Sequence, residues 1–198
     1  MNRRRGVENF DVVSCPPRLG YRKRSARMKF EIKSDRELRE GLPPASVWRP
    51  GFPNRIIHAQ YERLWKTDEQ FDLAVSAEVA TIFYEFVKTL GFFDIAPTQE
   101  WPELSYDAAL HLVNKFVRHS QAYEIELRSR EDAQLIATSI VENVPHARFF
   151  SNHDVVRQDG RIVNYVCHGG QLTYHTFEFA IVTMRPESIV LFLTCDED

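Results

Sequence analysis

The chain has 198 residues, of which 43% are hydrophobic and 27% are charged, the balance of an ordinary globular protein with a packed core. Its three cysteines are widely spaced and form no Cys-x-x-Cys pair, which argues against a disulfide framework or a zinc module and favours a reducing compartment. No apolar run approaches the ~20 residues that span a bilayer, so we expect no membrane segment and a cytoplasmic location.

Charge is distributed unevenly along the chain. Residues 1–27 carry eight Lys or Arg and two Asp or Glu, a net charge of +6, whereas residues 28–198 carry a net charge of −9. The basic segment lacks helical or strand periodicity, so we expect a disordered arm. Three interpretations remain open: an arm that binds nucleic acid or an acidic partner, an Arg-rich organelle presequence, or an over-extended start ahead of Met28. Residues 28–198 are expected to form one domain with an acidic surface.

The first part of this domain gives weak local signals. Phe30 and Ile32 alternate with charged residues and predict a short strand. Residues 34–41 predict a short helix, and residues 56–65 predict a helical turn or two. The proline-rich stretch 43–53 cannot be regular, but its aromatic residues favour burial. We expect it to wrap over the body, with a partner-binding loop as the alternative.

Three longer helices are predicted at residues 68–90, 105–119 and 131–144. The first begins at Thr67, which with Gln70 suits a capping box, and ends at Gly91. Its apolar positions recur at steps of three and four, so Phe83 and Phe86 are predicted core residues. Between the second and third helices, residues 122–128 alternate strictly and predict a half-buried strand.

The last fifty residues predict only β-structure. Apolar or alternating runs at 149–158, 161–168, 171–184 and 189–195 predict an antiparallel meander, with the long third strand at its centre. Asp159-Gly160 and Gly169-Gly170 predict two-residue hairpin loops. The expected fold is therefore α+β, a sheet of about five or six strands in total with the three main helices packed on one face.

These two loops also predict the register of the meander. Arg157 should pair with Ile162, and Asn164 should lie between Val155 and His175. By the same count His153 should pair with Val166. One sheet face then carries polar residues at one end and aromatic residues at the other. The candidate site residues on this face are His153, Arg157, Asn164, His168 and His175.

Neither a metal nor a cofactor is expected at this face. Three histidines suggest a metal site, because imidazole is a favoured ligand for zinc, copper and iron. The predicted register, however, places His175 two rows beyond His168 and brings no carboxylate near them. The chain also has only eight glycines and no phosphate-binding glycine loop, which argues against a nucleotide cofactor.

Two classes of function remain open. The absence of nucleophile, phosphate-loop and zinc-protease motifs favours a small non-catalytic binding or inhibitory protein, of an immunity or regulatory type. Its acidic body would engage another protein by charge complementarity. The alternative is a ribonuclease-like hydrolase of a phosphodiester, in which the His, Asn and Arg side chains supply acid, base and cation. A deep pocket around the histidines would favour the enzyme, and a flat or convex surface would favour the binder.

Overall fold

The computed structural model describes residues 28–32, 54–92, 101–141, 145–173 and 176–196. Its helices are α2 (Asp68–Leu73), α3 (Ser76–Thr89), α4 (Tyr106–Arg118) and α5 (Arg130–Ile140). Its strands are β1 (Phe30–Ile32), β2 (Asn54–Tyr61), β3 (Glu103–Leu104), β4 (Arg148–Ser151), β5 (His153–Gln158), β6 (Arg161–Cys167), β7 (Phe177–Met184) and β8 (Ser188–Asp196). The arm 1–27 and the predictions for residues 34–41 and 43–53 lie outside the described residues.

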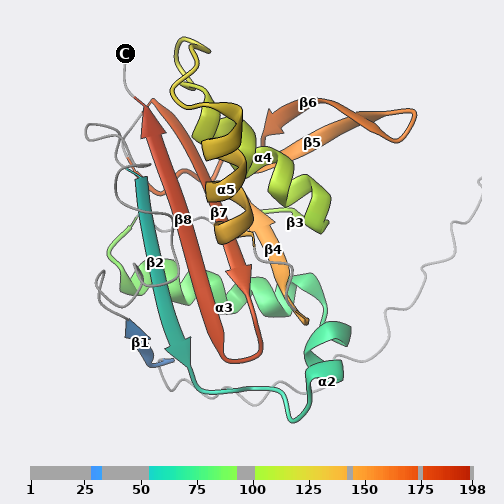
Figure 1. Ribbon diagram of the computed structural model, residues 1–198. Helices are drawn as coiled ribbons and strands as arrows, with labels where there is room; N and C mark the ends of the chain where they lie inside the picture. The colour runs from blue at the N-terminus through green and yellow to red at the C-terminus, as the bar shows by residue number, and fades with distance from the viewer. Residues whose placement is uncertain (1–27, 33–53, 93–100, 142–144, 174–175, 197–198) are drawn as a thin grey trace, which may run out of the picture.

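The strands form two separate sheets, both antiparallel. Six of them make the main sheet in the order β1-β2-β8-β7-β4-β3, and β5 and β6 make a two-stranded ribbon (Figure 1). The predicted α+β class is confirmed. Within the described ranges, no helix combines the length and apolar character that crossing a membrane requires.

The helices cover both faces of the main sheet, so the prediction that all three pack on one face is wrong. Helix α3 lies behind the sheet in Figure 1, and α4 and α5 lie in front of it. Side chains alternate along β7, so Ala180 and Val182 pack in the α3 core, while Phe179 and Ile181 pack in the core of α4 and α5. Both faces of the central strands are therefore buried.

The predicted helix 68–90 is two helices. Its start is confirmed, because the Thr67 hydroxyl accepts a hydrogen bond from the Gln70 N–H. Its end is also confirmed, because Gly91 follows α3 with a φ of +76°. The break between them has a tertiary cause: the Arg148 guanidinium, from β4, donates to the carbonyls of Phe71 and Ala74 at 3.1 and 2.6 Å. Arg148 thereby supplies the partners that the last carbonyls of α2 lack.

Two other segments differ from their sequence patterns. Residues 54–61, predicted in part as helix, form strand β2, which pairs with β8 along its length. Residues 122–128, predicted as a half-buried strand, form a loop in which Tyr123 and Ile125 are exposed and Glu124 has a φ of +54°. The carboxylate of Asp196 holds the start of this loop by accepting from the backbone N–H groups of Gln121 and Ala122. Long-range contacts override local propensity in both segments.

The C-terminal meander is only partly as predicted. The β7–β8 hairpin is confirmed, with Met184 opposite Ile189. The strand predicted at 149–158 is instead divided at Asn152 into β4 and β5. Strand β7 begins at Phe177 and pairs with β4 and β8, whereas β6 pairs only with β5 among the described strands. Gly169-Gly170 is therefore not a hairpin loop.

Candidate functional site

The β5–β6 ribbon gathers most of the candidate site residues. His153 and Arg157 lie on β5, Asn164 lies on β6, and His168 follows β6 directly. The ribbon extends past α4 and away from the main sheet (Figure 1). The predicted two-residue loop at its tip is confirmed, with Gln158 opposite Arg161. His175 lies outside the described residues.

Asn152 directs the chain from the main sheet into the ribbon. It is completely buried, and its side-chain oxygen accepts a hydrogen bond from the Ala180 N–H at 2.9 Å. The Asn152 amide thus continues the β4–β7 pairing where the β4 backbone turns away. Its own carbonyl accepts from the His168 N–H at 2.9 Å and so begins the ribbon. Sequence reasoning missed this residue, because an Asn within the polar stretch 151–154 gives no specific signal.

His153 is a buried residue at the base of the ribbon. Only 6% of it is exposed, and its ring packs against the rings of Phe116 and Phe179. Its Nδ1 lies 2.9 Å from the Asn152 side-chain oxygen, an acceptor without a hydrogen, so Nδ1 carries the proton. Burial, with a smaller contribution from the charge of His168, lowers the pKa of His153 to about 4. His153 is therefore neutral near pH 7.

Glu178 organises the loop that replaces the predicted second hairpin. It is buried on β7, and its carboxylate accepts from the backbone N–H groups of Leu172 and Thr173 at 2.7 and 2.8 Å. The Thr173 hydroxyl adds a third hydrogen bond at 2.7 Å. The sequence signal was present: a carboxylate between Phe177 and Phe179 must find donors if that run is buried.

The ribbon register agrees with the prediction only near the tip. Arg157 pairs with Ile162 as predicted, but the next pair is Val156 with Asn164. Val163 is therefore an extra residue on β6, and every later pair shifts by one position. His153 consequently lies opposite Cys167 rather than Val166, and the predicted pairing of Val155 with Asn164 is also wrong.

The inner face of the ribbon is attached to α4. Val155 and Tyr165, opposite each other, pack against the core of α4 and α5. The ammonium group of Lys115 lies 6.0 Å from the centre of the Tyr165 ring. Nearer the tip, the Arg157 guanidinium pairs with the Asp107 carboxylate at 2.6 Å. The inner face thus gives the ribbon a fixed orientation.

The outer face of the ribbon is open. Pairs next to Val155–Tyr165 point to the opposite side, which places Asp154, Val156, Asn164 and Val166 outward. Val156 and Val166 are each 42% exposed, and Val163 is 55% exposed. A shallow hollow lies at the tip, lined by Gln158, Asp159, Arg161 and Val163. The outer face of the ribbon comprises residues 154, 156, 158, 161, 163, 164 and 166. It carries three of the four exposed valines of the described residues.

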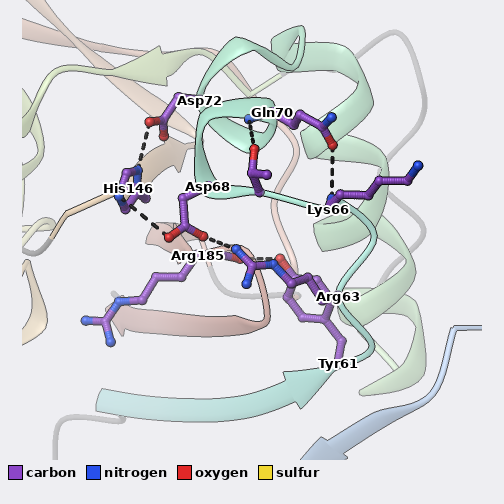
Figure 2. A network of polar contacts seen from close by, with 9 residues as sticks. Tyr61, Arg63, Lys66, Asp68, Gln70, Asp72, His146 and Arg185 are labelled. Atoms are coloured by element: carbon purple, nitrogen blue, oxygen red, sulfur yellow. Dashed lines mark hydrogen bonds and ion pairs between the residues drawn. The ribbon is translucent and has the colours of Figure 1, made fainter.

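A second polar cluster surrounds α2 (Figure 2), which lies at the opposite end of the molecule from the ribbon (Figure 1). His146 stands between two carboxylates of α2, with its Nδ1 2.8 Å from Asp72 and its Nε2 3.8 Å from Asp68. Asp68 also pairs with Arg63. The hydrogen bond to Asp72, together with the nearby carboxylate charges, raises the pKa of His146 above its usual value, although its slight desolvation opposes this. The cluster joins α2 to the segment before β4, which indicates a structural role.

Comparisons with known proteins identify no relative of this chain. No family model, curated protein or solved structure matches it. No group of three or more His, Cys, Asp or Glu side chains suited to a metal ion occurs in the described part of the chain. The function is therefore inferred from the geometry of the chain's own residues.

Proposed function

We propose that this chain is a non-catalytic protein-binding protein, of an inhibitory or regulatory type, that contacts its partner through the outer face of the β5–β6 ribbon. One observation carries the proposal: three exposed valines, Val156, Val163 and Val166, stand on an element that projects from the body. Clustered apolar side chains with polar neighbours at the surface are typical of interaction sites, whereas scattered single ones are not.

The anchoring of the inner face supports the same function. His153 fills an aromatic pocket at the base, and the Arg157–Asp107 ion pair holds the tip side against α4. A surface that is already fixed loses little conformational entropy when a partner binds. The ribbon therefore presents its valines at a lower entropic cost than a free loop would.

Charge and cysteine chemistry suggest the partner and the compartment. The net charge of −9 on residues 28–198 favours a basic protein partner, which long-range attraction would steer to the body. Among the described residues, neither Cys167 nor Cys195 forms a disulfide, and Cys167 is exposed. Reduced thiols persist in reducing compartments, which supports a cytoplasmic location.

The geometry of the described residues gives little support to the ribonuclease-like alternative. A phosphodiester hydrolase needs an acid, a base and a cation around one phosphate. Here His153 is buried, Arg157 faces α4, and Asn164 points to the opposite side of the ribbon. His168 is exposed. We therefore propose the binding function alone.

Capture of a partner by matched variants tests this proposal. The wild-type chain is used to isolate a partner from the source cells, and the affinity of the identified partner is then measured by calorimetry. The double variant Val156→Ser, Val163→Ser should weaken binding by at least about tenfold, because apolar contact at the centre of an interface carries most of its energy. The control Val75→Ser changes a valine that is 66% exposed but lies between α2 and α3. Equal affinity of all three proteins would contradict the proposal.

A further inference from the structure

We propose that the outer face of the β5–β6 ribbon pairs with the same face of a second copy of this chain, in a two-fold symmetric dimer. The inference rests on the proposed function, because it takes the ribbon as a binding surface and names one occupant for it. The valines show that the face is apolar, and its charges indicate which partner fits.

Apolar contact alone does not select the occupant. Val156 and Val166 are diagonal neighbours across the two strands, and Val163 continues toward the tip. None of the three belongs to either hydrophobic core, although Val155 and Tyr165 of the inner face pack against one. The outer valines are thus available to any apolar surface of matching shape.

On the two strands of this face, one charged residue lies near each end, and the two are opposite in sign. Asp154 lies at the base, and Arg161 lies at the tip, where it pairs with Gln158 and lies near the turn residue Asp159. Four residues of strand separate the two rows, roughly 13 Å at the usual rise per residue. Within the described ranges neither side chain forms an ion pair, whereas Arg157 on the inner face is paired with Asp107.

This arrangement is complementary to itself. In a two-fold interface the same patch meets its own copy, so if one residue contacts a second residue of the copy, the second also contacts the first. The two residues must therefore be compatible. A two-fold axis that lies in the plane of the interface, passes between Val156 and Asn164 and is perpendicular to the line from Asp154 to Arg161 brings the base row of one copy against the tip row of the other. Asp154 of each copy then meets Arg161 of the other, on both sides of a central apolar contact. A face with charges of one sign would repel its copy.

The size of the face predicts how strong the dimer is. Two short strands present only about seven outward residues, less than the ~800 Å² per partner of a standard interface. We therefore expect a weak, rapidly exchanging dimer that weakens further with salt, since its ion pairs are near solvent. A tighter partner would compete for the same face.

Charge exchange between two variants tests the dimer on the full chain. Sedimentation equilibrium from about 10 micromolar to about 1 millimolar covers the affinity expected of an interface of this size. Arg161→Asp and Asp154→Arg should each weaken self-association by at least about tenfold, because like charges then meet twice. An equimolar mixture of the two variants should dimerise, since every contact between them joins opposite charges. Arg130→Asp on α5 is the control for net charge and should behave as wild type.

The possible outcomes separate the dimer from the proposed function. A wild-type chain that stays monomeric throughout, or a mixture that does not dimerise, overturns the dimer. Loss of association in Arg130→Asp equal to that in Arg161→Asp also overturns it, because the effect would then be general. If the dimer fails but the valine variants still lose their captured partner, the binding function stands. If the wild-type chain dimerises as expected but the valine variants keep the affinity for their captured partner, the binding function is contradicted instead. Melting curves of each variant confirm folding, and Val166→Ser provides an uncharged test of the same face.

Discussion

The main sheet and the β5–β6 ribbon are both antiparallel but are covered differently. Strands β7 and β8 are buried on both faces, between α3 on one side and α4 and α5 on the other. The ribbon is covered on its inner face alone, so Val156 and Val163 remain exposed. Apolar side chains on strands therefore form the core in one region and part of the surface in the other. Stability should reside in the sheet, and binding in the ribbon.

The largest difference between the regions should appear on truncation of a core aromatic residue. Phe83 is completely buried on α3. The centre of its ring lies 5.0 Å from the ring centre of Trp101 and 5.7 Å from that of Phe150. Phe83→Ala should lower the free energy of unfolding by about 3–5 kcal/mol, because it removes a large contact and leaves a cavity. The ribbon control Val163→Ala should cost less than about 0.5 kcal/mol. Urea denaturation measures both, and similar losses would contradict the division between the regions.

The free energy of unfolding should depend on pH through His153, which lies at the base of the ribbon where it leaves the main sheet. Its pKa is about 4 in the folded protein and near 6.5 in the unfolded chain, because burial opposes the charged form. Between these values the unfolded chain binds more protons, so this contribution is complete above pH 6.5 and falls as the pH drops toward 4. The loss amounts to about 3 kcal/mol.

Replacement of this histidine isolates its share of the pH dependence. His153→Phe removes the titrating group while keeping a ring in the aromatic pocket, so the curve of unfolding free energy against pH should be flatter between pH 4 and 6.5. His168→Gln, an exposed change nearby, is the control and should keep most of the slope. Chemical denaturation at several pH values gives both curves. An unchanged slope in His153→Phe would mean that this ring is not buried in solution.

Asn152 should contribute somewhat less, through its hydrogen bonds. Asn152→Ala leaves the Ala180 N–H and the His153 Nδ1–H without their common acceptor in a buried site. Unpaired buried donors are costly, and we expect a loss of about 2–3 kcal/mol. Relative to wild type, hydrogen exchange in Asn152→Ala should accelerate more in the ribbon than in β8. An equal change in the two regions would contradict the role of Asn152 in connecting the ribbon to the main sheet.

The smallest effect is expected at His146, in the segment before β4 that ion pairs join to α2. Its raised pKa means that the folded state binds the proton more tightly, so its contribution is present below pH 6.5 and is lost as the pH rises through the folded value. His146→Gln should lower the melting temperature slightly near pH 5.5 and not near pH 9. High salt should reduce the difference, because the cluster is exposed. A larger effect at pH 9 would contradict the role of the ion pairs.

Much of the local structure followed from the sequence. Alternation along residues 177–184 correctly predicted which side chains share a sheet face, because successive residues of a strand point to opposite sides. Thr67 and Gly91 correctly marked helix ends, and Asp159-Gly160 marked a hairpin, because each relies on backbone preferences of a few residues. Candidate residues His153, Arg157 and Asn164 were correctly placed on neighbouring strands, but their prediction on one face is wrong, because the extra residue Val163 turns Asn164 to the outer side.

Only the tertiary structure decided how these pieces combine. Alternation defines two faces but does not say which helix covers each, so the distribution of α3, α4 and α5 could not be read from the pattern. Arg148 ends α2 from a distant strand, and Asn152 turns the chain out of the main sheet by bonding to β7. Val163 shifts the register that the tip loop would otherwise extend. The outcomes at Arg148 and Asn152 depend on partners far away in sequence, and such tertiary contacts override local preferences, which span only about 1 kcal/mol.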